Sequence, residues 1–210
     1  MGARRVLGRA AATTLVAVCT VASSSCTSTG RQMAGEGATT GAVAGAVGGL
    51  LSALIFGGDP AEGAARGAVW GASTGAVAGG MTGDRIDSKR EQQRAQQQDA
   101  DLEKLRAELG DDAFAGLEAL ADCRHEIALG YARSAARSDD RNHALAGLWL
   151  EVLTHADRRD EAQARALFPE LVAADSHLGS EAQAEETMRE TLQSLMDIRA
   201  EYGLQRVCPA

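Results

Sequence analysis

The stretch that decides the fold of this 210-residue chain runs from residue 41 to residue 83 and reads GAVAGAVGGLLSALIFGGDPAEGAARGAVWGASTGAVAGGMTG. Two rows of glycines recur in it every four residues. They are Gly41, Gly45 and Gly49 in the first row, and Gly63, Gly67, Gly71, Gly75, Gly79 and Gly83 in the second. Between the rows, Gly57-Gly58-Asp59-Pro60 is a strong turn signal. The pattern predicts a helical hairpin over residues 39–83, with helices at 39–56 and 61–81.

Regular glycine spacing in a helix indicates contact with another helix. Glycine costs a helix ~1 kcal/mol per residue in water relative to alanine. Small residues four apart form a flat groove that lets a second backbone approach closely, with a right-handed crossing. Each predicted helix is also just long enough to cross a hydrocarbon core of ~30 Å. We therefore expect the hairpin to associate with a membrane or with further copies of the chain. A flexible Gly/Ala linker is the alternative.

The N-terminus has the three-part layout of an export signal. Arg4, Arg5 and Arg9 form a basic region, residues 10–22 carry no charge, and three serines precede Cys26. This layout predicts a signal peptide over residues 1–25. The cysteine after small residues resembles a bacterial lipobox, which implies acyl chains such as palmitate on Cys26; Cys19 is the competing position. Residues 26–38 are then expected to form a flexible tether.

Residues 41–87 resemble the glycine-zipper two-helix domain of bacterial outer-membrane lipoproteins. The matching pieces are residues 41–45, the Gly-Gly-Asp-Pro turn, residues 71–79 and the polar exit at residues 83–87. The resemblance implies a location in the cell envelope and contact with a membrane, and it implies no catalytic residue. In the lipobox sorting rule, Thr27 in place of aspartate implies the outer membrane. The C-terminal half carries no such resemblance.

The charge of the chain lies in its C-terminal part. The net charge is −8, and the 16 basic and 26 acidic residues from Asp84 onward give 16 − 26 = −10. This acidity argues against nucleic-acid binding, which requires clustered Lys and Arg. Residues 84–110 read as a polar helical linker with an apolar seam at Leu102, Leu105 and Leu109. Residues 111–210 read as an acidic helical bundle, so the expected fold class is all-α.

Apolar spacing and capping signals predict the helices of this bundle. Phe114, Leu117, Leu120, Cys123, Ile127 and Tyr131 share one face of a first helix. Asp139 or Asp140 is placed to cap a second helix, which carries Leu145, Leu148, Trp149, Val152 and Leu153. A third lies near residues 160–168, where Pro169 ends or restarts it. Ser180 and Gln183 resemble a capping box for a last helix with Met188, Leu192, Leu195 and Ile198, and Gly203 ends it.

Candidate catalytic and metal-binding motifs are weak. His125-Glu126 begins like the zinc-protease motif HExxH, but residue 129 is leucine. The pairs Asp122/His125 and Asp140/His143 have a spacing that bundle metal sites use, yet they lack further facing carboxylates. We therefore expect no enzyme activity, no metal and no cofactor.

Two cysteines remain after export and lipidation, namely Cys123 and Cys208. Pairing is favoured in an oxidising compartment. The predicted disulfide closes a loop of more than 80 residues, which is worth ~4.5 kcal/mol in the chain-entropy description. Two unpaired thiols are the alternative.

These features favour a non-enzymatic envelope lipoprotein, held to the outer membrane through Cys26 and facing the periplasm. The zipper would contact the membrane or form a homo-oligomer, and the acidic bundle would bind an unidentified periplasmic protein. A zipper-built pore or secretion accessory is the alternative, and a periplasmic metalloenzyme is less favoured.

Overall fold

A computed structural model describes residues 28–60, 62–68 and 87–209 of the chain. Every regular element within these ranges is helical, which confirms the all-α prediction. Residues 62–68 are helical after the turn that follows α1. Cys19, Cys26 and the zipper glycines Gly71, Gly75, Gly79 and Gly83 lie outside the described residues. The helices are α1 (Ser28–Phe56), α3 (Asp87–Leu109), α4 (Asp111–Ala121), α5 (His125–Ala135), α6 (Arg141–Asp157), α7 (Glu161–Ala166), α8 (Phe168–Ala174) and α9 (Glu181–Glu201).

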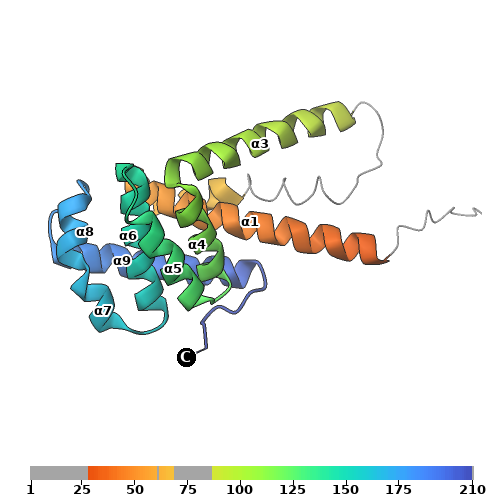
Figure 1. Cartoon of the computed structure of the whole chain (residues 1–210). Helices are drawn as coiled ribbons and strands as arrows, with labels where there is room; N and C mark the ends of the chain where they lie inside the picture. The colour runs from red at the N-terminus through yellow and green to blue at the C-terminus, as the bar shows by residue number, and fades with distance from the viewer. Residues whose placement is uncertain (1–27, 61, 69–86, 210) are drawn as a thin grey trace, which may run out of the picture.

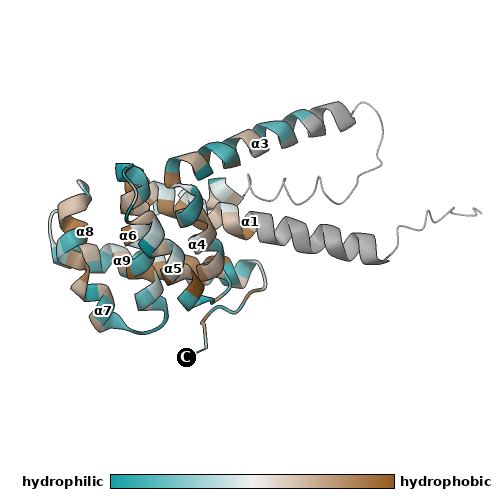
Figure 2. Ribbon diagram, in the orientation of Figure 1, coloured by the Kyte–Doolittle hydropathy of each residue, from teal (hydrophilic) through white to brown (hydrophobic). Residues whose placement is uncertain are grey.

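The C-terminal half of α1 is a core helix of the folded domain. Its apolar side chains Val47, Leu50 and Leu51 are at most 1% exposed. They belong to the same hydrophobic core as Leu117 of α4 and Leu195 of α9. Figure 2 shows brown apolar segments alternating with teal polar segments along the helices of this domain. The predicted hairpin segment and the predicted bundle therefore share one core.

The first helix starts earlier than the sequence pattern indicated. α1 begins at Ser28 rather than near residue 39, so residues 28–38 are helical and not a flexible tether. Its N-terminal half extends away from the other helices on the same side as the N-terminal half of α3 (Figure 1). Among the described residues, no helix combines the length and the apolar character needed to cross a membrane.

The predicted first helix of the bundle is two helices. α4 ends at Ala121, Cys123 adopts a left-handed backbone conformation with φ 61°, and α5 begins at His125. The break rotates the second half of the predicted apolar face outward, leaving Ile127 47% and Tyr131 38% exposed. The face of α5 that packs inward instead carries Ala128, Leu129, Ala132 and Ala135. A single helical period drawn through residues 114–131 could not anticipate this turn.

The predicted caps at Asp140 and Ser180 form, but the Gln183 side chain accepts a hydrogen bond from Gly179 N–H at 2.9 Å, which is one residue before the position that a full capping box requires. The Asp140 carboxylate accepts hydrogen bonds from the backbone N–H groups of Asn142 and His143, at 2.8 and 3.2 Å. The Ser180 hydroxyl accepts one from Gln183 N–H at 3.3 Å. A new helix, α8, begins at Phe168 with Pro169 in its first turn, and Gly203 follows α9 with φ 74°.

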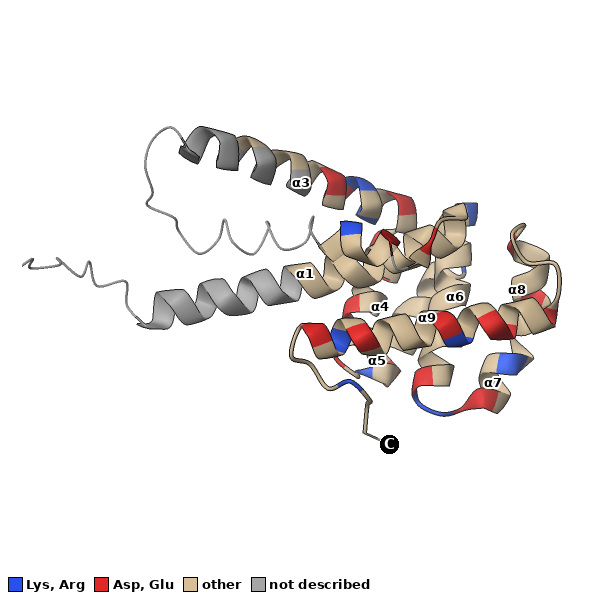
Figure 3. Ribbon diagram, turned by 180° about the vertical axis from the view of Figure 1, so that it is seen from behind, with Lys and Arg blue, Asp and Glu red and all other residues tan. Residues whose placement is uncertain are grey.

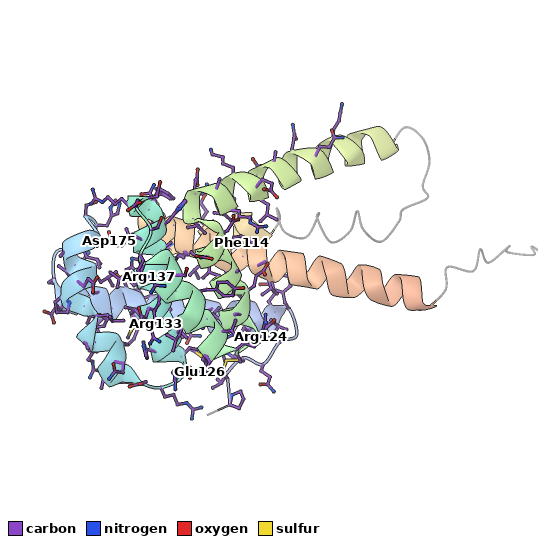
Figure 4. The ribbon with its side chains drawn as sticks, in the orientation of Figure 1. Phe114, Arg124, Glu126, Arg133, Arg137 and Asp175 are labelled. Atoms are coloured by element: carbon purple, nitrogen blue, oxygen red, sulfur yellow. A yellow bond between two sulfur atoms is a disulfide. The ribbon has the colours of Figure 1, made fainter. Side chains whose placement is uncertain are left out.

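A buried hydrogen bond also joins α6 to the end of α8. The Trp149 indole N–H donates to the Asp175 carboxylate at 2.9 Å (Asp175 is labelled in Figure 4).

The apolar seam of the linker helix is also confirmed. Leu105 and Leu109 of α3 are 2% and 0% exposed, and Leu102 packs against the core. Gly110 separates α3 from α4 with φ 85°, a conformation that glycine adopts without the strain of a side chain. The C-terminal end of α3 is therefore attached to the bundle, although its sequence is strongly polar.

Candidate functional site

The described part of the zipper is a contact between two helices of the same chain. Gly45 and Gly49 of α1 face Gly63 and Gly67 of the returning helix. A Cβ atom added to Gly49 would overlap the carbonyl oxygen of Gly63, and one added to Gly67 would overlap that of Gly45. The backbones therefore approach as closely as the four-residue glycine spacing predicts.

The neighbouring glycine of α1, Gly48, allows a close contact on a different face of the helix. A Cβ at Gly48 would lie 3.1 Å from Leu105 Cδ2 and 3.2 Å from Phe114 Cε2. α1 is thus enclosed between the returning zipper helix on one side and α3 and α4 on the other. This arrangement explains why Leu50, Leu51, Leu54 and Ile55 are buried in protein, whereas Phe56 at the end of the apolar run is 46% exposed.

A second site lies at the other end of the bundle, where Arg199 of α9 is fully buried. Its guanidinium pairs with both oxygens of Asp157, with Nη1–Oδ1 at 2.8 Å and Nη2–Oδ2 at 2.7 Å. It also donates to the backbone carbonyls of Leu120 and Ala121. A cation at these carbonyls complements the negative end of the α4 dipole. Two-pronged pairing of this kind is the strongest geometry open to an arginine and a carboxylate.

His125 and the disulfide complete this polar cluster. His125 Nε2 lies 2.8 Å from Asp157 Oδ2. A disulfide joins Cys123 and Cys208, whose Cα atoms are 5.4 Å apart (the yellow bond near the labels of Arg124 and Glu126 in Figure 4). Cys208 Sγ lies 3.2 Å from Asp157 Oδ2. We call Cys123, His125, Asp157, Arg199 and Cys208 the polar cluster; it connects α4, α5, α6, α9 and the C-terminal tail.

Opposing effects act on the Asp157 carboxyl. Burial raises its pKa, whereas the hydrogen bonds and charges of Arg199 and His125 lower it. The net effect holds the pKa of Asp157 below its usual value, so the carboxylate is ionised at neutral pH. A buried carboxylate of this kind is tolerated because its charge is paired and its oxygens are hydrogen-bonded.

The motif-based metal pairs do not form. Asp122 pairs with Arg124 at 3.0 Å, and His125 turns instead to Asp157. Asp140 caps α6, while His143 Nε2 lies 2.9 Å from the carbonyl oxygen of Ala107. The structure does group His125, Asp157 and Cys208, whose candidate ligand atoms lie within 4.8 Å of one another. Sequence spacing could not reveal this group because its members come from three distant segments.

The two other histidines have separate surroundings. The ring of His177, in the loop before α9, lies against Gly57 at the zipper turn. His155 of α6 is 7% exposed, and its Nδ1 atom has no hydrogen-bond partner among the described residues. Neither histidine belongs to the polar cluster.

The glycine rows, their turn and the close backbone contact point to one kind of protein. Residues 6–87 match the YMGG-like Gly-zipper family. This match confirms the resemblance that the glycine rows indicated, and it suggests association with a membrane. Searches of curated proteins and of solved structures found no match to the chain. The role of the helical domain that follows the Gly-zipper segment is therefore inferred from its geometry.

Proposed function

We propose that the protein is a non-enzymatic lipoprotein of the bacterial cell envelope, anchored to the outer membrane through Cys26 and facing the periplasm. The observation that carries this proposal is the course of α1. This helix begins at Ser28, two residues after Cys26, and its C-terminal half packs in the core of the folded domain. Acyl chains on Cys26 would thus be connected to the domain by a continuous helix. The Gly-zipper contact would stabilise that helix.

Lipid labelling tests the anchor directly. Cells that express the full chain with labelled palmitate should incorporate label into the wild-type protein and into Cys19→Ser, but not into Cys26→Ser. One acyl chain alone binds membranes only marginally, so mass spectrometry should find more than one on the mature N-terminus. An unmodified N-terminus, or label retained by Cys26→Ser, would refute the proposal.

A homo-oligomer or pore built by the Gly-zipper is the second candidate. The glycines Gly45, Gly49, Gly63 and Gly67 are already engaged within one chain. Assembly of several copies would therefore use other glycines of the rows. Purified protein in planar bilayers distinguishes the candidates, because a pore gives discrete conductance steps and a lipid-anchored monomer gives none.

The proposed partner is a periplasmic protein that contacts the helical domain. Ile127 and Tyr131 lie one helical turn apart on α5 and are both exposed. Acidic residues also line the exposed side of α9 (Figure 3). Photo-crosslinking from position 131 in native envelopes should capture the same partner repeatedly. Crosslinking from exposed Glu170 on α8 provides the matched control.

A further inference from the structure

The disulfide of the polar cluster occupies a set of groups that are common metal ligands. His125 Nε2 lies 2.8 Å and Cys208 Sγ 3.2 Å from the same oxygen of Asp157, and Cys123 Sγ is bonded to Cys208 Sγ. Two thiolates, an imidazole and a carboxylate are ligands that zinc accepts in tetrahedral geometry. Zinc–ligand bonds of ~2.0–2.3 Å place tetrahedral ligand atoms roughly 3.3–3.8 Å apart. The candidate ligand atoms of His125, Asp157 and Cys208 already lie within 4.8 Å of one another, and the two distances to Asp157 Oδ2 are slightly shorter than this spacing.

We propose that the reduced protein binds one Zn²⁺ ion through Cys123, Cys208, His125 and Asp157, so that the polar cluster alternates between a disulfide and a metal site. The disulfide form offers only His125 and Asp157 as ligands. Reduction supplies the two sulfur ligands in the same place.

Charge balance supports this alternation. In the disulfide form, the buried Asp157 carboxylate is neutralised by Arg199, whose side chain is 0% exposed. In the zinc form, two thiolates and one carboxylate carry −3, while the ion and the guanidinium carry +3. Both states of the buried cluster are therefore neutral overall, and an uncompensated buried charge, which is strongly unfavourable, is avoided in each.

Arg199 is placed to act as a positioning residue for the carboxylate ligand. Its Nη1 and Nη2 hold Asp157 Oδ1 and Oδ2 at 2.8 and 2.7 Å, and the Oδ2 atom so fixed also lies next to His125 and Cys208. The guanidinium is itself fixed by the carbonyls of Leu120 and Ala121. Groups that orient a metal ligand in this way are a regular part of metal sites.

The chain around the two sulfurs allows the required adjustment. Cys123 sits in the turn between α4 and α5, and Cys208 lies in the non-helical tail after α9. The sulfur atoms must separate from bonding distance to ~3.7 Å, as two ligands of one zinc ion do. A small shift of the tail achieves this without moving a helix.

In the cell, a dithiol reductant supplies the redox step by exchange with the protein disulfide. One thiolate of the reductant attacks a sulfur of the Cys123–Cys208 bond, and its second thiolate resolves the mixed disulfide. The protein gains two electrons and two protons as two thiols, and the reductant becomes a disulfide. Zinc then binds both sulfurs and displaces their two protons.

Cobalt substitution tests the proposal in the full-length chain carrying Cys19→Ser and Cys26→Ser, so that only the two cluster thiols remain. After anaerobic reduction with a phosphine, Co²⁺ should bind at one ion per chain, with thiolate-to-cobalt charge-transfer absorption and the visible bands of tetrahedral cobalt. The oxidised chain should show neither signal. If reduced, helical protein takes up no cobalt, or shows no charge-transfer absorption, the proposal is wrong.

A pair of neighbouring variants tests the ligand assignment. His125→Gln should weaken Zn²⁺ binding by about tenfold or more in competition with a coloured chelator. Glu126→Gln, whose side chain is exposed on the next residue of α5, should leave the affinity unchanged. Equal affinity of the two folded variants would remove His125 from the site and overturn the proposed ligand set. X-ray absorption identifies the atoms bound to zinc in the reduced chain that keeps His125 and Glu126. Two sulfur and two nitrogen or oxygen neighbours of the zinc ion support the proposal, and a zinc ion without sulfur neighbours overturns it.

Discussion

The buried Arg199 illustrates how much of this protein depends on single long-range contacts. It follows Leu195 by four residues and so lies on the inward face of α9, but it belongs to no motif. Its partners Leu120, Ala121 and Asp157 lie between 42 and 79 residues earlier in the chain. Helical spacing places Arg199 on the apolar face of α9, but only the tertiary structure shows which distant groups pair with it.

Removing this guanidinium should destabilise the protein strongly. Arg199→Met leaves the Asp157 carboxylate buried without its main partner, which is expected to lower the free energy of unfolding by about 3–5 kcal/mol. Urea unfolding followed by circular dichroism measures the change. The control is Arg189→Met on the same helix, where an exposed pair with Glu185 is lost at a cost of about 1 kcal/mol or less. Equal effects of the two variants would contradict the assignment.

His155 should make stability depend on pH near neutrality. Burial lowers the pKa of His155 below the usual histidine value of about 6.5, against the opposing effects of Glu151 and Asp160. The unfolded chain then takes up this proton at a higher pH than the folded chain. The free energy of unfolding should therefore fall as pH drops through about 6.5 and level off below the folded pKa.

Two measurements check this prediction. Titration of the His155 ring by nuclear magnetic resonance should give a pKa below 6.5. In His155→Leu, the free energy of unfolding should change less between pH 7.5 and pH 5.5 than it does in the wild-type protein. A His155 pKa at or above 6.5 in the folded protein would show that the neighbouring carboxylates outweigh burial.

At the scale of elements, α1 packs against two partners, the returning zipper helix and the helical domain. The glycine row explains the close contact with residues 62–68, as the sequence predicted. The same helix buries Leu50, Leu51, Leu54 and Ile55 against the domain. These residues provided the apolar character that made a membrane span conceivable, and the structure uses them for packing.

Alanine substitutions distinguish a packed glycine from an unconstrained one. Gly49→Ala places a Cβ on the backbone of the returning helix, so the free energy of unfolding should fall by about 1–3 kcal/mol. Gly130→Ala on α5 has no heavy atom within 4 Å of the added Cβ. It should raise the free energy of unfolding by up to about 1 kcal/mol through helix propensity. Thermal unfolding of both variants provides the comparison, and a stabilised Gly49→Ala would show that the close contact is absent.

At the scale of the whole molecule, the acidic half does not complete its core alone. α1 contributes Val43, Val47, Leu50, Leu51, Leu54 and Ile55 to the core shared by α3, α4, α6 and α9. Burial of each such side chain stabilises a fold by roughly 1.5–3 kcal/mol. The disulfide between Cys123 and Cys208 closes the other end, across a sequence separation of 85 residues.

A chain of residues 100–210 should therefore fail to form the native domain. Without α1, its exposed apolar surface should bind a fluorescent hydrophobic dye, and the near-ultraviolet circular dichroism of Trp149 should weaken. A chain of residues 28–210 carries the missing helix and serves as the control. Cooperative unfolding of the shorter chain with the same midpoint as the control would show that the acidic half is independent.

The sequence by itself determined the helical class, the zipper pairing, the N-caps of α6 and α9 and the identity of the two cysteines that lie together. These features depend on spacing within a helix, on local hydrogen bonds or on elimination. Only the tertiary structure decided that α1 enters the core, that the helix predicted through residues 114–131 breaks at Cys123, and that Arg199 joins Asp157 and His125. These outcomes depend on which distant surfaces meet. A helical period shows that a face is apolar, but lipid, a second copy and the chain's own domain can each cover it.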